Sequence, residues 1–230
     1  MELEKRNIGH IPALWMGEGT RGGYLFLHGK QGRKEEAISF ARQAVPMGYR
    51  VLAIDLPEHG ERENSGEKLL PWVAVPEIRA ACELLRQSCG SVRVRANSIG
   101  AWLAMEALQR ERVEKALFVS PVVDMEGLIR TMMGWANVTE GELERAGEVP
   151  TRFGETLSWE YLRWVRAHPV TWRAPTAVLC GSGDTLISRE MVDQFLAKTG
   201  GALTVMEGGE HWFHTPEQMK VLETWERANL

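Results

Sequence analysis

The sequence has few cysteines, no long apolar run and no excess of basic charge, and each shortage excludes a class of protein. The spacing of its three cysteines, Cys82, Cys89 and Cys180, fits neither a disulfide framework nor a zinc knuckle. Every apolar run is broken by charge, glycine or proline before the ~18 residues that a membrane helix needs. The net charge of -4 gives nucleic-acid phosphates no long-range attraction. We therefore expect neither a membrane nor a nucleic acid as a partner.

The N-terminal residues 1–6 lack the basic start and the apolar stretch of a signal peptide. Together with the unpaired cysteines, this start predicts a cytoplasmic protein with reduced thiols. The apolar fraction of 44% and the charged fraction of 25% are typical of a globular chain, and 230 residues fit a single domain over 1–230.

Short apolar runs alternate with longer segments of helical periodicity, which predicts an α/β fold. Most runs are apolar on both faces, as in a doubly wound, mostly parallel sheet with helices on both faces. The expected strands are 24–27, 51–54, 92–94, 116–119, 177–180 and 202–206, and the expected helices are about 34–47, 72–88, 99–110, 189–198 and 216–228. Residues 3–6 and 11–16 are candidates for two antiparallel edge strands.

One segment, about 124–172, interrupts the alternation with short helical pieces and no strand pattern. We interpret it as a small helical cap inserted after the strand that ends at Val119, because a structureless loop of that length is improbable. Aromatic residues on such a cap more often pack the cap itself than bind substrate. A cap over the strand ends would nevertheless line a site there, so the candidate substrate-binding residues are Trp135, Trp159, Trp164 and, beyond the cap, Trp212.

The segment 96–100, Ala-Asn-Ser-Ile-Gly, joins an expected strand to an expected helix. A serine between small residues at such a junction is what a nucleophile elbow requires, because the tight turn holds the hydroxyl clear of the backbone. The alternative is that Asn97 or Ser98 only caps the helix.

Three further motifs follow strands. His28-Gly29-Lys30 forms a turn after an early strand, Asp184 follows the next-to-last expected strand, and His211 follows the last one. Because the carboxyl ends of parallel strands meet at one edge of the sheet, we expect Ser98, Asp184 and His211 to lie together there.

With these motifs in this order, together with the 55–60 loop, the chain resembles the α/β-hydrolase superfamily from Leu3 to the last helix. Within it, the chain is most similar to small-capped esterases and to acyl-peptide or dienelactone-type hydrolases. One position departs from the family pattern, since Ala96 stands where Gly-x-Ser-x-Gly has its first glycine. Alanine keeps the position small, so we expect a tighter elbow and not a broken one. The serine nucleophile argues against a dehalogenase or an epoxide hydrolase of the same fold.

The resemblance implies that Ser98 is the nucleophile, His211 the general base and Asp184 the acid that orients it. It also implies an oxyanion hole made by the backbone N–H groups of Ile99 and Lys30. The expected reaction is the hydrolysis of a small-molecule carboxylic ester, with no cofactor and no metal. An amidase or peptidase with the same triad is one alternative, and a non-catalytic small-molecule-binding homologue is another. The oligomeric state stays open.

Rival residues exist for two roles. Asp124 follows the strand before the cap, where some family members place the acid, and His214 is a second candidate for the base. His28 and His59 are expected to hydrogen-bond the backbone in structural turns, and neither His10 nor His168 has neighbours that suggest a role. The side chain of Lys30 is either solvated or available to an acidic group of the substrate.

Overall fold

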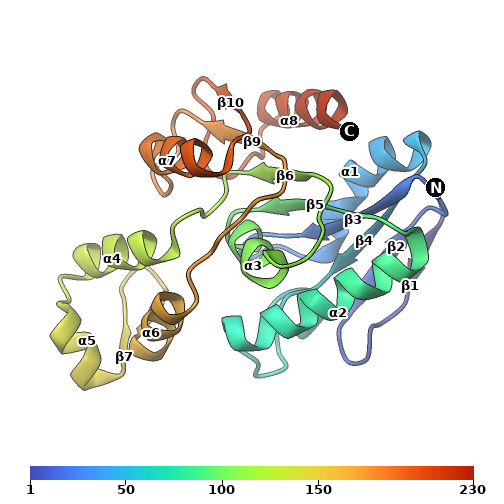
Figure 1. Cartoon of the computed structure of the whole chain (residues 1–230). Coiled ribbons are helices and arrows are strands. Elements are labelled where there is room, and N and C mark those ends of the chain that lie inside the picture. Colours follow the sequence, from blue (N-terminus) through green and yellow to red (C-terminus); the bar gives the residue numbers. More distant parts are fainter.

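A computed structural model describes all 230 residues and contains a central eight-stranded sheet (Figure 1). Its strand order is β1-β2-β4-β3-β5-β6-β9-β10. Only the pairings of β2 with β1 and β4 are antiparallel. The strands are β1 (Leu3–Lys5), β2 (Ala13–Met16), β3 (Gly22–Leu27), β4 (Tyr49–Ile54), β5 (Val92–Asn97), β6 (Ala116–Val119), β9 (Thr176–Gly181) and β10 (Ala202–Met206). The sheet is therefore doubly wound and mostly parallel, as the sequence predicted.

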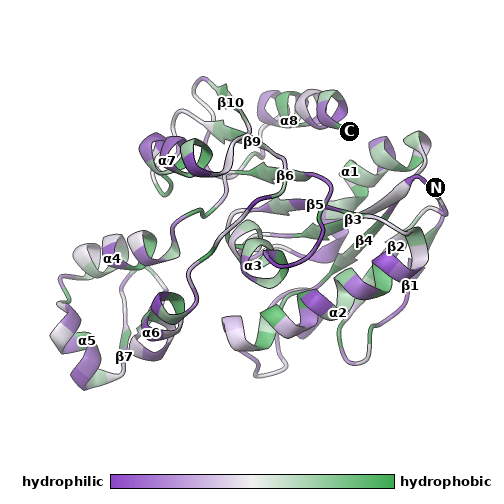
Figure 2. Ribbon diagram, in the orientation of Figure 1, coloured by the Kyte–Doolittle hydropathy of each residue, from purple (hydrophilic) through white to green (hydrophobic).

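Helices cover both faces of this sheet. α1 (Ala37–Ala44) and α8 (Pro216–Asn229) pack on one face through residues such as Phe40 and Trp225. α2 (Pro71–Cys89), α3 (Ile99–Leu108) and α7 (Arg189–Thr199) belong to the larger core on the other face. Figure 2 shows the hydrophobic colour along the central strands and hydrophilic stretches on the outer sides of the helices. Short 3-10 helices occupy Lys34–Glu36, Val45–Met47 and Gly60–Arg62.

Strand β5 continues three residues beyond the apolar run that predicted it. Val92, Val94 and Ala96 face the larger core, and the alternate residue Arg95 is buried toward α8. The Arg95 guanidinium donates to the Glu226 carboxylate at 2.8 Å, so the charge is compensated inside the fold. Burial raises the pKa of Glu226 against the opposing effect of Arg95. A buried ion pair thus replaces the apolar contact that sequence reasoning expects in a strand.

The inserted segment forms a cap between β6 and β9. It consists of α4 (Met125–Ala136), α5 (Glu140–Ala146), the antiparallel hairpin β7 (Glu148–Pro150) and β8 (Thr156–Ser158), and α6 (Trp159–Ala167). Figure 1 shows these elements standing to one side of the sheet, joined to it by two linkers. The hairpin corrects one expectation, since the segment does contain strands.

The N-terminal strands are antiparallel, as predicted, but only β1 is an edge strand. Strand β2 lies between β1 and β4 and is fully buried, because its four residues, Ala-Leu-Trp-Met, are apolar. No helix combines the length and the hydropathy needed to cross a membrane.

Candidate active site

Ser98 lies on a strained turn between β5 and α3. Its φ of 48° and ψ of -120° place a non-glycine residue in a sparsely populated region of backbone space. The turn is fixed on both sides, because the Ser98 N–H donates to the Val119 carbonyl at 3.0 Å and the Ser98 carbonyl accepts from the Val122 N–H at 3.1 Å. The predicted elbow is formed, and Ala96 is accommodated within the sheet, fully buried.

Two glycines allow the elbow to approach strand β3. A Cβ on Gly100 would lie 2.3 Å from the His28 carbonyl oxygen, so no side chain fits there without moving the backbone. A Cβ on Gly29 would lie 3.3 Å from the Ser98 Cβ. The turn after β3 therefore lies directly against the serine.

Replacing Gly100 by alanine is expected to destabilise the protein by about 2 to 3 kcal/mol, because the added methyl group collides with backbone and not with a flexible side chain. Chemical denaturation measures this change in the free energy of unfolding. Gly134→Ala is the matched control, since Gly134 lies in α4 with nothing within 4 Å of an added Cβ. That control should gain up to about 1 kcal/mol, and equal destabilisation of the two variants would contradict the close-approach argument.

The structure brings Ser98, His211 and Asp184 into one hydrogen-bonded chain. The Ser98 Oγ lies 2.8 Å from His211 Nε2, and His211 Nδ1 lies 2.7 Å from Asp184 Oδ2. The other carboxylate oxygen of Asp184 accepts from two backbone N–H groups, those of Leu186 at 2.8 Å and Ile187 at 2.9 Å. The Asp184 side chain is only 2% exposed, whereas the His211 side chain is 24% exposed. A buried, fully hydrogen-bonded carboxylate thus holds an accessible imidazole against the serine.

The loops that carry Asp184 and His211 pack tightly on each other. A Cβ on Gly181 would lie 2.1 Å from the Gly209 carbonyl oxygen, and the Gly183 N–H donates to that oxygen at 2.8 Å. These glycines, which the sequence shows only as turn residues, set the spacing of Asp184 and His211.

Asp124 and His214, the other candidates for the acid and the base, make contacts elsewhere. The Asp124 carboxylate accepts from the Gly127 N–H at 2.9 Å and caps α4. The His214 Nδ1–H donates to the Trp212 carbonyl at 2.8 Å, and the His214 ring stacks on Trp212 with centroids 4.6 Å apart. Neither residue is hydrogen-bonded to the Ser98 to Asp184 chain.

The peptide between Gly29 and Lys30 is held by its carbonyl group. The Gly29 oxygen accepts from His28 Nδ1–H at 2.7 Å and from the Gly32 N–H at 3.1 Å. Because a trans peptide is planar, fixing the carbonyl also fixes the direction of the Lys30 N–H. That N–H has no acceptor within the protein, so it is available to a ligand beside Ser98.

His28 and His59 both hydrogen-bond the backbone, as expected. His28 Nε2 accepts from the Leu56 N–H at 3.1 Å, and His59 Nδ1 donates to the Pro57 carbonyl at 2.8 Å. Burial is the main cause that lowers the pKa of His28 to about 4. His28 is therefore neutral in the folded protein over most of the physiological range.

The free energy of unfolding is expected to fall as the pH decreases from about 6.5 toward 4, because unfolded His28 then binds a proton that folded His28 refuses. The full difference is about 3 kcal/mol. Urea denaturation across this pH range should show a flatter dependence for His28→Gln than for wild type, even though the variant is less stable at pH 7. His168→Gln, at an exposed histidine, should keep the wild-type slope; an equally flat curve there would refute the assignment.

The four candidate tryptophans do not form one group. Trp164 packs against Trp102 and stacks on His168 with centroids 4.0 Å apart, and Trp159 is partly buried against the larger core. Trp135 is 53% exposed beside Phe153, and Trp212, next to His211, is 71% exposed. The structure thus places two of them in packing roles and leaves two at the surface.

Sequence reasoning missed an aromatic cluster that joins the cap to the core. Trp102, one turn after Ser98 on α3, stacks on Tyr161 of α6 with centroids 6.1 Å apart, and Trp72 of α2 lies 6.3 Å from the same ring. The Tyr161 hydroxyl is buried without a hydrogen-bond partner, and burial raises its pKa. The helical positions of these residues were readable, but their meeting depends on where the cap docks.

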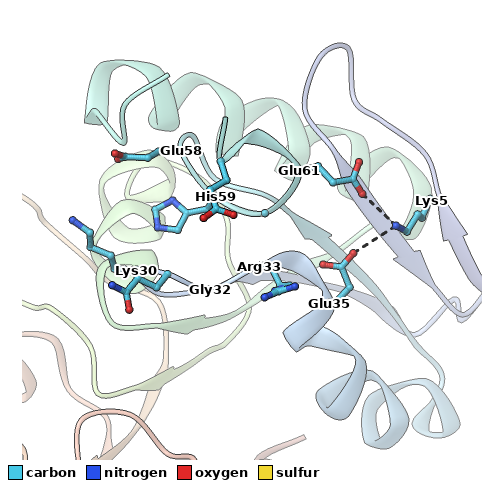
Figure 3. A pocket seen from close by; sticks show the side chains of 11 residues that line it. Lys5, Lys30, Gly32, Arg33, Glu35, Glu58, His59 and Glu61 are labelled. Atoms are coloured by element: carbon cyan, nitrogen blue, oxygen red, sulfur yellow. Dashed lines mark hydrogen bonds and ion pairs between the residues drawn. The ribbon is translucent and has the colours of Figure 1, made fainter. Parts of the chain in front are cut away.

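A cavity of about 580 Å³ lies beside the turn after β3 (Figure 3). Its lining contains no apolar side chain, and it includes Lys30, His59 and Glu61. A second cavity of about 570 Å³ lies between α7 and the linkers of the cap. Neither is lined by Ser98 or His211, so neither encloses the hydrogen-bonded chain.

His10, Glu67 and Glu77 come together although the sequence shows no metal-binding spacing among them. The Arg62 guanidinium donates to Glu77 at 2.6 and 2.9 Å and to Glu67 at 2.8 Å. The guanidinium pairs with both carboxylates and His10 Nε2 lies 2.8 Å from Glu77 Oε1, so the group is an ion-pair network at the loop before α2.

The parallel sheet, the serine on a strained strand-to-helix turn and the histidine and aspartate on neighbouring loops define a hydrolase of the α/β class. The family model described as the Alpha/beta hydrolase family matches residues 24–223, and the chain belongs to that family. A comparison with curated protein sequences finds no significant match.

Solved structures share the fold at low identity. Est1E from Butyrivibrio proteoclasticus, with ferulic acid bound, has a TM-score of 0.79 at 16% identity over 98% of this chain and 97% of that one. A structure described as a putative hydrolase from Agrobacterium vitis has a TM-score of 0.79 at 17% identity over 99% of each chain. Alpha/beta hydrolase domain-containing protein 10 from mouse has a TM-score of 0.76 at 15% identity over 98% of this chain and 96% of that one.

Proposed function

We propose that this α/β hydrolase cleaves carboxylic esters by a serine acyl-enzyme mechanism. The observation that carries the proposal is the unbroken chain from Ser98 Oγ through His211 to the buried carboxylate of Asp184. Such a chain lets the imidazole accept the serine proton while the carboxylate stabilises the imidazolium.

In the first half-reaction, Ser98 Oγ attacks the ester carbonyl carbon and its proton passes to His211 Nε2. The oxyanion accepts hydrogen bonds from the Lys30 and Ile99 N–H groups, and Ile99 begins α3, where the N–H groups have no acceptor within the helix. The tetrahedral intermediate then expels the alkoxide, which takes the proton from His211 and leaves as the alcohol. The product is an acyl-Ser98 ester.

In the second half-reaction, a water molecule gives a proton to His211 Nε2 and attacks the acyl carbon. The new tetrahedral intermediate releases Ser98, which recovers the proton from His211. The products are the carboxylic acid and the free enzyme, and the cycle needs no cofactor.

The aromatic side chains of the cap and its contact with α3 favour an apolar or aromatic acyl group. The solved Est1E structure holds ferulic acid, an aromatic acid, which supports the inclusion of aryl esters among the test substrates. Trp212 and Trp135 are the exposed candidates for contact with such a group.

The test combines turnover with a covalent label. Purified protein is assayed with short-chain and aryl p-nitrophenyl esters, and a fluorophosphonate label is located by mass spectrometry. We expect ester hydrolysis and a single label on Ser98. A label on another residue would refute the proposed nucleophile.

The same assay separates the alternatives. Labelling of Ser98 without ester turnover would favour an amidase or peptidase, because only the leaving group and the pocket differ in those enzymes. The absence of both labelling and turnover would favour a non-catalytic binding protein on the same fold.

A further inference from the structure

The cap contacts the rest of the domain at few points. Its helices and hairpin pack chiefly on one another, the aromatic cluster around Tyr161 joins the cap to α2 and α3, and two ion pairs extend from the hairpin segment to lysines outside the cap. Glu155, in the turn between β7 and β8, pairs with Lys30, and Glu148 of β7 pairs with Lys68 at 3.7 Å. Each is an ion pair between a glutamate of the hairpin segment and a lysine outside the cap, so the two can be compared directly.

Only the first pair reaches the turn beside Ser98. Lys30 supplies a free backbone N–H next to the serine, and its side chain extends to the cap. Figure 3 shows the ammonium group directed away from His59 and from the centre of the polar cavity. Lys68, by contrast, lies in the loop before α2, and its pair with Glu148 is more exposed, at 62% and 57% against 43% and 36%.

In the turn after β3, the hydrogen bonds that hold the backbone around Lys30 lie mainly before Lys30, at the Gly29 carbonyl. Hydrogen bonds from His28 and Gly32 fix the Gly29 carbonyl, but the next residue, Gln31, has a φ of 61°, in the left-handed region. A non-glycine residue there stores strain unless its surroundings hold it. The Lys30 side chain gives the turn its contact with the cap.

We propose that Glu155 is a positioning residue for the reaction: by holding the Lys30 side chain, it adds to the hydrogen bonds on the Gly29 carbonyl in keeping the Lys30 N–H in place, so the oxyanion hole is better ordered when the cap hairpin is seated. The inference rests on the proposed function, because it assigns the Lys30 N–H to the oxyanion. Glu155 itself contacts neither the reacting atoms nor Ser98.

The expected effect is moderate and falls on kcat. A partly exposed ion pair contributes up to about 1 kcal/mol, which corresponds to roughly a fivefold change in rate. A donor that is better placed for the developing oxyanion than for the substrate changes kcat more than KM. Salt screens such a pair, so part of the effect disappears at high ionic strength.

The experiment measures kcat and KM for p-nitrophenyl butyrate in full-length Glu155→Gln, Lys30→Met and the exchanged pair Lys30→Glu with Glu155→Lys. Lys30→Met keeps the backbone N–H and removes only the charge. We expect about a three- to fivefold lower kcat in each single variant, with KM changed less than twofold. The exchanged pair should recover at least half of the wild-type kcat, and the double variant Lys30→Met with Glu155→Gln should be no slower than either single one.

Glu148→Gln is the matched control, because it removes the other cap-to-core pair without touching the oxyanion turn. It should keep kcat within twofold of wild type. Wild-type kcat in Glu155→Gln, or an equal loss in Glu148→Gln, would overturn the positioning role while leaving the ester hydrolase intact. A wild-type protein that neither turns over esters nor labels at Ser98 would instead reject the proposed function, and the positioning role with it.

Discussion

Replacing Ser98 by alanine is expected to lower kcat for ester hydrolysis by on the order of 10⁴-fold or more. The loss is this large because the variant removes the only atom that bonds to the acyl carbon. His211 and Asp184 keep their mutual hydrogen bond, so we expect a water molecule activated by His211, together with the proposed oxyanion donors Lys30 and Ile99, to give the residual rate. Initial rates at saturating p-nitrophenyl butyrate measure the change.

The same variant should fold normally. Ser98 Oγ donates to or accepts from His211 alone, so its removal takes away one partly buried hydrogen bond. Thermal denaturation and circular dichroism should match wild type within a few degrees. Ser39→Ala, on the first turn of α1, is the matched serine control and should leave kcat unchanged. Wild-type turnover in Ser98→Ala would exclude the acyl-enzyme mechanism at this residue.

Replacing Asp184 by asparagine is expected to lower kcat by roughly 10³- to 10⁴-fold. One carboxylate oxygen accepts from the Leu186 and Ile187 N–H groups, so the amide oxygen of asparagine takes that place. The amide NH₂ group then faces His211 Nδ1 and forces it to accept a hydrogen bond. The proton moves to Nε2, which can no longer receive the proton of Ser98.

The control for this substitution is Asp124→Asn. Asp124 caps α4 through the Gly127 N–H, so its replacement should leave turnover within a few fold of wild type. The pH dependence of kcat/KM adds a second readout, because the Asp184 variant loses the general base in its active tautomer. If Asp124→Asn were the damaging change and Asp184→Asn were silent, the acid would have to be reassigned.

The sequence predicted the sheet and the residues at the carboxyl ends of its strands, because apolar runs and the turn motifs that follow them are local patterns. Runs such as 24–27 and 116–119 are apolar on both faces, which only a strand covered on both sides satisfies. Five motifs in a fixed order then placed Ser98, Asp184 and His211 at the ends of parallel strands. Distances among them follow from topology, since parallel strands end at a common edge.

Within the cap, the sequence pattern that predicts strands and helix ends was weaker than in the sheet. Each strand of the β7–β8 hairpin is only three residues long, which is too short for an alternation of polar and apolar residues to be recognised. Its pairing, and the start of α6 at Trp159 with Ser158 as the N-cap, were settled by contacts with α4 and α5. Short strands of this kind depend on their neighbours and not on their own periodicity.

By itself, then, the sequence determined the doubly wound, mostly parallel sheet and predicted an inserted segment and three candidate residues at the carboxyl edge, because hydrophobic periodicity and the order of motifs along the chain are read without the fold. Only the tertiary structure decided which side chains meet across the molecule. Arg95 forms an ion pair with Glu226, Trp102 stacks on Tyr161 and Lys30 forms an ion pair with Glu155, each over a long separation in sequence. Such contacts depend on how helices and loops dock in three dimensions, and no spacing along the chain encodes that docking.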